Sequence, residues 1–125
     1  MIIGEFSTLS KLDHPLLCEL LEVFIDKNFI YFVNPFYTGG EVFDLMFENS
    51  QDEESDYSPL PEKTVKIIIY QVLKVMSYLK QNNILHRDLK PENIMFESLF
   101  DTKTKDAVKS FIKIIDFGYS LDLGE

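Results

Sequence analysis

Basic residues, cysteine and tryptophan are scarce in this sequence. Its 125 residues include 12 lysines and arginines against 21 aspartates and glutamates, with a single cysteine and no tryptophan. The resulting net charge of −9 predicts neither nucleic acid nor an anionic membrane as a partner, because both attract basic surfaces. One cysteine excludes a disulfide within the chain, and with only two histidines beside it no zinc site is predicted. Cys18 is expected to fill a core position.

Long apolar runs are missing as well. No stretch reaches the roughly 18 apolar residues that a membrane helix needs. No secretory or myristoylation signal is recognisable at the start of the sequence. Membrane contact is therefore not predicted.

Two short motifs indicate the chemistry. Residues 86–93 read HRDLKPEN, and residues 116–118 read DFG. Phosphoryl transfer needs a carboxylate that orients the attacking hydroxyl, and it needs oxygen ligands for divalent metal ions. Asp88 suits the first task, and Asn93 and Asp116 can supply the ligands. The two motifs, in this order, resemble the catalytic loop and the Asp-Phe-Gly motif of Ser/Thr protein kinases.

Other segments follow in the order of the same family, in its calcium/calmodulin-dependent or calcium-dependent branch. Residues 4–15 resemble the αC helix and its exit loop, and residues 20–33 resemble a β-hairpin of the small lobe. Residues 34–43 resemble the gatekeeper, the hinge and the start of αD. Residues 94–96 and 111–115 resemble the strand pair between the two motifs. A helix is predicted from Thr64 to the Asn82-Asn83 stop, with these side chains in the core: Val65, Ile68, Ile69, Val72, Met76 and Leu79.

The resemblance implies an α+β fold of the two-lobed kinase type. This sequence corresponds to the part of that fold from αC through the Asp-Phe-Gly motif. The sequence contains no G-x-G-x-x-G or Val-Ala-x-Lys, and it ends before an Ala-Pro-Glu motif. Residues 1–125 are therefore expected to be a partial kinase domain that is inactive in isolation. Two other hypotheses remain open: a catalytically dead kinase-like scaffold, and a partial gene model without independent function.

Catalytic and metal-binding roles carry over residue by residue. The resemblance implies that Asp88 is the base and that Lys90 lies near the transferred phosphoryl group. Asn93 and Asp116 would bind Mg²⁺. The implied reaction transfers the γ-phosphoryl group of ATP to a Ser or Thr hydroxyl of a protein in the cytoplasm, with the nucleus also open.

A nucleotide site is implied by the same route. The adenine would bond the Pro35 carbonyl and the Tyr37 amide, Met95 would lie beneath it, and Glu41 would reach the ribose. Glu92 is counted with the nucleotide-binding residues, together with Lys90, Asn93 and Asp116. Glu41 and Glu92 also match positions that meet a substrate arginine, which predicts Arg-x-x-Ser/Thr substrates.

Supporting residues complete the expected site. Glu5 matches the αC glutamate, whose strand lysine is not found in this sequence. Asn34 takes the gatekeeper position and is expected to find a hydrogen-bond partner in the nucleotide pocket. His86 is expected to pack under Phe117. The acidic segment 48–62 and the segment 97–110 are predicted to be surface loops.

Overall fold

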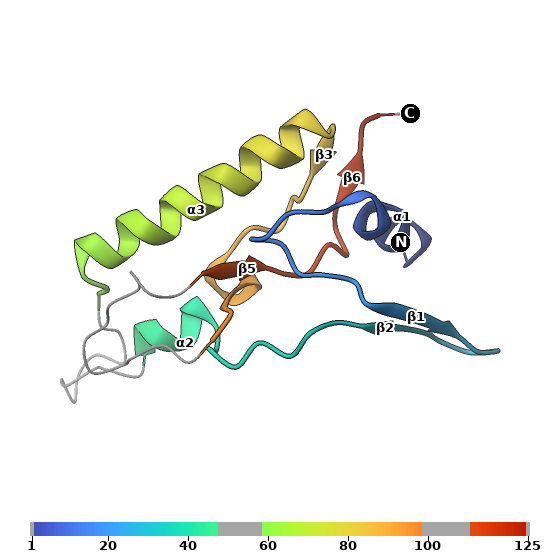
Figure 1. The fold of residues 1–125 in the computed structure, drawn as a ribbon, viewed down its shortest axis with the longest axis horizontal. Coiled ribbons are helices and arrows are strands. Elements are labelled where there is room, and N and C mark those ends of the chain that lie inside the picture. The colour runs from blue at the N-terminus through green and yellow to red at the C-terminus, as the bar shows by residue number, and fades with distance from the viewer. Residues whose placement is uncertain (1, 48–58, 99–110, 125) are drawn as a thin grey trace.

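The chain folds into helices and small antiparallel sheets (Figure 1). A computed structural model describes residues 2–47, 59–98 and 111–124, so most of both predicted surface loops lies outside the described residues. The helical elements are α1 (Ile2–Lys11), α2 (Val42–Phe47), α3 (Glu62–Gln81) and the 3₁₀ turn η1 (Pro91–Asn93). The strands are β1 (Glu22–Ile25), β2 (Ile30–Val33), β3 (Ile84–Leu85), β4 (Ile94–Phe96), β5 (Ile112–Ile114) and β6 (Leu121–Asp122). This mixture confirms the predicted α+β class.

Within the described residues, the strands pair into three two-stranded antiparallel sheets. β1 pairs with β2, β3 with β6, and β4 with β5. The first sheet is the hairpin predicted within residues 20–33. Its turn is closed by Asp26, whose Oδ1 accepts the backbone N–H groups of Asn28 and Phe29, both at 2.7 Å. An aspartate that bonds the backbone two or three residues ahead is a strong turn former, which explains why the chain reverses here.

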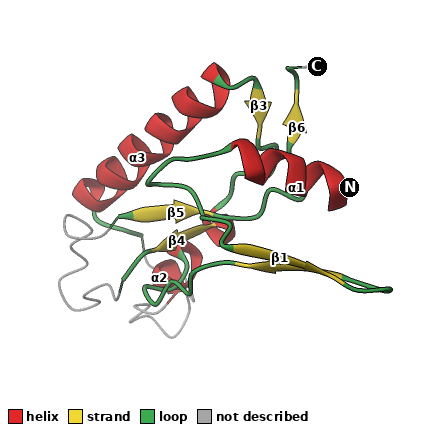
Figure 2. Cartoon of the chain, turned by 45° about the vertical axis from the view of Figure 1, so that its right-hand side comes forward, coloured by secondary structure: helices red, strands yellow, loops and turns green. Residues whose placement is uncertain are grey.

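α3 lies along one edge of the molecule (Figure 2) and ends at its predicted stop. Asn82 caps the helix, and Asn83 takes the left-handed conformation with φ of 57°, which asparagine tolerates better than most residues. Among the described residues, none of the helices is both long and apolar enough to cross a bilayer.

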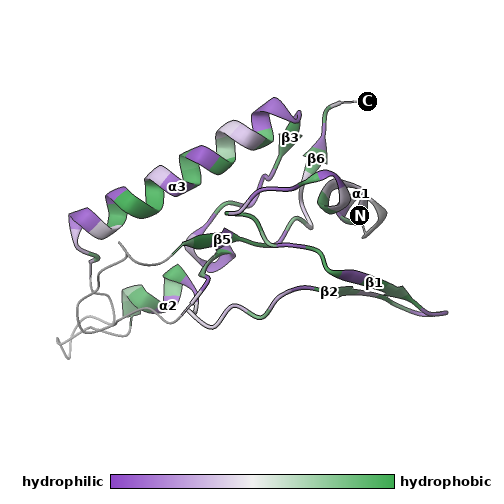
Figure 3. Ribbon diagram, viewed as in Figure 1, coloured by the Kyte–Doolittle hydropathy of each residue, from purple (hydrophilic) through white to green (hydrophobic). Residues whose placement is uncertain are grey.

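The buried face of α3 differs from the predicted one. Ile68 and Leu79 are buried as expected, but Val65, Ile69 and Met76 are 40%, 49% and 41% exposed. The buried face of the helix consists of Thr64, Ile68, Gln71, Val75 and Leu79. Hydrophilic and hydrophobic stretches alternate along α3 (Figure 3), and its exposed side still carries Ile69, Leu73 and Met76, so hydrophobicity alone did not select the side that faces the core.

The core lies between α3 and the β4–β5 pair. Val75, Phe96, Ile112 and Ile114 are at most 1% exposed. The β1–β2 hairpin extends away from this core, and none of its strand residues is buried (Figure 1). The chain before the hairpin is tied to β5 instead, through bonds from the Cys18 N–H to the Ile114 carbonyl at 2.9 Å and from the Ile114 N–H to the Leu16 carbonyl at 2.9 Å.

α1 is attached to the last described strand. Lys11 Nζ lies 2.5 Å from Asp122 Oδ2, and this ion pair joins the end of α1 to β6. Because β6 also pairs with β3, α1 is connected through it to the strand that leads into residues 86–93.

Gln71 carries one of the contacts that hold α3 on the sheet. Its Oε1 accepts the Ile112 N–H at 3.0 Å in a buried environment. We expect Gln71→Leu to lower the free energy of unfolding by about 1–3 kcal/mol, because the buried N–H of β5 would lose its acceptor. Urea unfolding followed by far-UV circular dichroism measures this change. Gln81→Leu, at the exposed end of the same helix, is the control, and equal effects of the two substitutions would contradict the prediction.

Candidate active site

The loop after β3 is held from beneath by His86, which is 3% exposed. The Asp88 N–H donates to His86 Nδ1 at 3.2 Å, so the imidazole carries its proton on Nε2 and donates it to the Ile115 carbonyl at 2.9 Å. Arg87 between them has φ of 67°, a costly conformation for a long side chain, and its Nε donates to the Tyr119 carbonyl at 2.6 Å. The loop is thereby fixed to the chain around residues 115–119.

Asp88 is oriented by two neighbours in the same motif. Lys90 Nζ lies 3.2 Å from Asp88 Oδ2, and Asn93 Nδ2 donates to the same oxygen at 3.1 Å and to the Asp88 carbonyl at 3.0 Å. Asn93 is buried at 6% exposure, whereas Lys90 reaches solvent. Asp88 raises the pKa of Lys90 through this hydrogen bond and through its charge, so Lys90 stays cationic. The arrangement presents a directed carboxylate beside a fixed positive charge.

Asp116 lies next to this loop although 28 positions separate it from Asp88 in the sequence. The Ile115 N–H donates to the Asn93 carbonyl at 3.0 Å, which joins the two motifs through the backbone. Phe117 is 1% exposed and meets the edge of His86, with ring centroids 4.7 Å apart. Asp116 itself is exposed and has φ of 60°. The buried phenylalanine anchors the turn while the aspartate is turned outward.

Asn93 and Asp116 suit a divalent cation. Asn93 donates a hydrogen bond from Nδ2 to Asp88, so its amide oxygen points away from that carboxylate and is available as a ligand. Asp116 adds an exposed carboxylate, and oxygen pairs of this kind are what Mg²⁺ binds when phosphates supply further ligands. Within the described ranges no cluster of three His, Cys, Asp or Glu side chains forms a site for another metal.

A cleft of about 340 Å³ opens beside Asp116. Its lining contains seven of the predicted site residues: Glu5, Asn34, Pro35, Tyr37, Met95, Asp116 and Phe117. The other predicted residues do not line it; Glu41 adjoins its edge through an antiparallel bridge to Met95, and Lys90 lies in a neighbouring groove. Sequence reasoning missed Cys18, Phe32 and Ile115 as lining residues, because no motif marks them.

Cys18 and Asn34 differ from their expected environments. Cys18 is only half-buried and lines the cleft, because the preceding Leu16 and Leu17 occupy the core positions of this segment. Asn34 finds its hydrogen-bond partner in the protein, since its Nδ2 donates to the Glu19 carbonyl at 2.7 Å. The wall of the cleft therefore carries the Cys18 thiol and the Asn34 amide, whose Nδ2 is already bonded to the protein backbone.

Glu5 and Asp116 line the same cleft, and the charge of Asp116 acts on Glu5. This makes the stability of the fold depend on pH. Burial raises the pKa of Glu5 above its ordinary value of 4.5, and the Asp116 charge raises it further. An acid whose pKa is higher in the folded chain stabilises the fold at low pH, and that contribution is lost as the pH rises through the folded pKa. We expect Glu5→Gln to be more stable than the parent at pH 7 and equal to it near pH 4.

Thermal melts at the two pH values measure this difference. Glu22→Gln, on the exposed strand β1, is the matched control for the loss of one carboxylate. A Glu5→Gln variant that is less stable than the parent at pH 7 would contradict the prediction.

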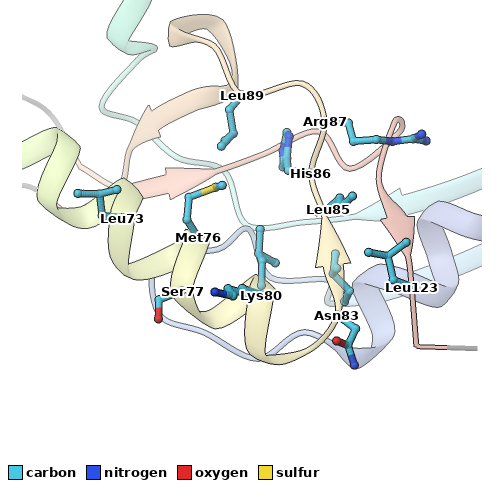
Figure 4. A pocket seen from close by; sticks show the side chains of 12 residues that line it. Leu73, Met76, Ser77, Lys80, Asn83, Leu85, His86, Arg87, Leu89 and Leu123 are labelled. Atoms are coloured by element: carbon cyan, nitrogen blue, oxygen red, sulfur yellow. The ribbon is translucent and has the colours of Figure 1, made fainter.

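A larger cavity of about 850 Å³ lies on the other side of the loop, between α3, β3 and the end of the described chain (Figure 4). Leu73, Met76 and Leu123 give it an apolar wall, and His86 and Arg87 border it. None of its lining residues is acidic, so it offers no carboxylate for a metal–phosphate complex. Carboxylates lie instead on the side of the loop that carries Asp88 and Asp116.

Comparison with known proteins agrees with these motifs. Residues 1–125 match the sequence profile of the protein kinase domain. Calcium-dependent protein kinase 4 of Plasmodium falciparum (isolate 3D7) is 40% identical over 119 residues, which are 95% of this chain and 20% of that protein. The protein of the same name from Plasmodium berghei (strain Anka) gives the same values. Calcium-dependent protein kinase 3 of Plasmodium yoelii yoelii is 39% identical over 114 residues, 91% of this chain and 18% of that protein. The chain spans about a fifth of the length of these relatives.

Proposed function

Because this chain belongs to the protein kinase family, we propose that it supplies the catalytic loop, the metal ligands and part of the nucleotide cleft of a Ser/Thr kinase domain. Its relatives confirm the predicted resemblance to the calcium-dependent branch. The proposed reaction transfers the γ-phosphoryl group of ATP to a Ser or Thr hydroxyl of a protein. We place it in the cytoplasm, with the nucleus as the alternative, because its phosphate donor is an intracellular metabolite. Residues 1–125 would form one part of that two-lobed domain.

The observation that carries this proposal is the environment of Asp88. Its carboxylate is held by Lys90 and Asn93, so it can accept a hydrogen bond from an incoming hydroxyl. It would take the hydroxyl proton as the new P–O bond forms and the bond from the γ-phosphorus to the bridging oxygen breaks, which releases ADP. Lys90 would then offset negative charge on the transferred phosphoryl group. Asn93 and Asp116 would hold Mg²⁺, which neutralises phosphate charge when bound.

The nucleotide would occupy the 340 Å³ cleft. Pro35 and Tyr37 would contact the adenine and Met95 would lie beneath it, all three of which line that cleft. Glu41 would contact the ribose, because its bridge to Met95 brings it to the edge of the same space. This placement leaves the triphosphate directed towards Asp116.

An assay needs a host, since the sequence contains neither G-x-G-x-x-G nor Val-Ala-x-Lys. We define the chimaera as calcium-dependent protein kinase 4 of Plasmodium falciparum in which this chain replaces the matching 119-residue segment. Incubated with calcium, Mg²⁺ and labelled ATP, the chimaera is expected to phosphorylate Ser and Thr peptides and to leave Tyr peptides unmodified. A folded chimaera that binds ATP but transfers no phosphate would overturn the proposal.

That negative outcome would favour a second candidate, a kinase-like binding protein without catalysis. One observation supports it. Glu5 is partly buried and lies beside the like charge of Asp116; burial raises its pKa and the Asp116 charge raises it further, which differs from the environment of a carboxylate paired with a lysine. The labelled-phosphate assay on the chimaera separates the two candidates directly.

Substrate preference gives a further prediction. Glu41 directly precedes α2 and Glu92 lies in η1, and these two elements contact each other, so both carboxylates belong to one region of the surface. An arginine three positions before the acceptor would form charge-assisted hydrogen bonds with such a pair. We expect the chimaera to prefer Arg-x-x-Ser peptides over Ala-x-x-Ser peptides by about tenfold or more in kcat/KM, because such bonds are worth about 1.5–3 kcal/mol.

Paired kinetics with the two peptides measure this preference. The substitutions Glu41→Gln and Glu92→Gln should each reduce it, whereas Glu22→Gln on the distant hairpin should leave it unchanged. A parent chimaera that prefers proline or acidic residues at that position would refute the prediction.

A further inference from the structure

Two hinge side chains hold the backbone of one residue that precedes the hairpin. The hinge segment, residues 34–37, begins with Asn34, whose Nδ2 donates to the Glu19 carbonyl at 2.7 Å. It ends with Tyr37, whose hydroxyl accepts the Glu19 N–H at 3.3 Å. The donor and the acceptor of Glu19 are thus both bound by the two ends of the hinge segment.

Tyr37 cannot easily leave this position. Its side chain is buried at 8% exposure, and the Lys113 ammonium lies 5.6 Å from its ring centroid. Lys113 is itself held, because its Nζ donates to the Pro15 carbonyl at 2.6 Å. Burial raises the pKa of Tyr37 to about 12, so its hydroxyl stays neutral and remains an acceptor for the Glu19 N–H. The ring and the hydroxyl therefore fix one end of the hinge segment.

Between these two anchors lie the backbone groups that would bind the adenine. Proline at position 35 restricts its own φ and has no N–H. The groups that would bond the adenine are the Pro35 carbonyl and the Tyr37 N–H. Within residues 2–47, 59–98 and 111–124, neither group has a backbone hydrogen-bond partner. Their spacing is set by how the segment is held at residues 34 and 37.

We propose that Asn34 and Tyr37 are positioning residues, which hold the hinge segment on Glu19 and so preset the Pro35 carbonyl and the Tyr37 amide for a purine base. The inference rests on the proposed function, because it concerns the base-binding edge of the same cleft. Asn34 acts through the protein backbone, since its amide donor is already used by Glu19. Loss of either side chain therefore weakens base binding without removing a ligand contact made by that side chain.

Two measurements on the 125-residue chain test the proposal, with Asn34→Leu, Tyr37→Phe and the double variant. The first is amide hydrogen exchange without ligand. Tyr37→Phe removes the acceptor of the Glu19 N–H, and we expect exchange at Glu19 to accelerate at least about tenfold. The Val75 and Leu79 amides, in the buried part of α3, should keep their parental rates and so report an intact fold.

The second measurement is a titration with adenosine, followed by the NMR signals of residues 34–38. Each single variant is expected to weaken binding by about three- to tenfold, the range of one lost hydrogen bond. The double variant should weaken binding by less than the product of the two single effects, because loss of either hydrogen bond already loosens the attachment of the hinge segment to Glu19. Tyr31→Phe is the control, because it also removes one hydroxyl, on the hairpin, where Tyr31 bonds Asp26.

The outcomes separate this inference from the proposed function. Unchanged adenosine affinity and unchanged Glu19 exchange in both single variants, with the parent binding adenosine, overturn the inference alone. A parent that shows no saturable adenosine shift overturns the nucleotide site of the proposed function. The exchange rates at Glu19 then still decide whether Tyr37 holds the hinge segment on Glu19. Equal weakening by Tyr31→Phe would show a general loss of stability and would also overturn the inference.

Discussion

Asp88→Asn in the chimaera is expected to lower kcat by about 10²–10⁴-fold, the usual contribution of a positioned general base. Asparagine has nearly the same shape as aspartate and can still contact Lys90 and Asn93, but it cannot accept the proton of the substrate hydroxyl. The KM for ATP should change little, because the cleft residues that would contact the nucleotide are untouched. Initial rates with labelled ATP and a Ser peptide measure both constants.

Asp13→Asn provides the control for this substitution, since it removes one exposed carboxylate outside both motifs. The 125-residue chain without the host sequences should show no measurable transfer under the same conditions. A glycine-rich loop and a strand lysine normally orient the phosphates, and orientation contributes about 7–11 kcal/mol to such reactions. An Asp88→Asn chimaera with kcat within threefold of its parent would show that Asp88 is not the general base.

Gly39→Ala is expected to be the most destabilising single substitution considered for this chain. An added Cβ would lie 2.5 Å from the Phe96 carbonyl oxygen and closer still to Phe96 Cβ and to the Ser98 carbonyl oxygen. Two of these three atoms are backbone, and the Gly39 N–H itself donates to the Phe96 carbonyl at 3.2 Å. Relief of the clash would therefore separate residues 39–40 from β4, at a cost of about 3 kcal/mol, the upper part of the range for overpacking.

Gly4→Ala is the matched control, because nothing lies within 4 Å of its added Cβ. Gly4 is inside α1, where alanine is favoured over glycine by about 0.5–1 kcal/mol, so this substitution should stabilise the chain. Urea unfolding of both variants measures the two changes, which should have opposite signs. The clash argument fails if Gly39→Ala unfolds within 0.5 kcal/mol of the parent, a margin of about the size of surface substitutions.

Gly39 also connects stability with function. It follows the hinge segment and precedes Glu41, and the Gly40 carbonyl accepts the Phe96 N–H at 2.9 Å. This close backbone contact holds the chain after the hinge against β4, which carries Met95. A variant that loosens this backbone contact should therefore also weaken adenosine binding. An adenosine titration followed by the NMR signals of residues 34–38 measures this effect.

Secondary structure and the central motif were largely predictable because their signals are local. Residues 86–93 place Asp88, Lys90 and Asn93 within six positions, so contacts among them need only one loop conformation. The helix that ends just before Asn82 and the hairpin closed by Asp26 follow equally from near neighbours in the chain. The family resemblance was predictable for the same reason, because its motifs are short and contiguous.

The exposure of each face of α3 was not predictable in the same way. Gln71 is polar yet buried, and its burial is tolerated because the Ile112 N–H, 41 positions away, supplies a hydrogen bond. Ile69 and Met76 are apolar yet exposed, because the sheet packs against the opposite side of the helix. Hydrophobicity predicts how much of a helix can be buried, but the packing partner decides which side is buried.

The sequence by itself determined the family and the α+β class, and it predicted the residues proposed to carry the chemistry, since these depend on short runs of particular side chains. Only the tertiary structure decided that Asn34 and Tyr37 both bind Glu19, that Cys18 lines the cleft, and that Glu5 lies near Asp116. The physical reason lies in the groups involved. Glu19 contributes a backbone N–H and a backbone carbonyl, which nearly every residue possesses, so no pattern of side chains could have marked it as the anchor of the hinge.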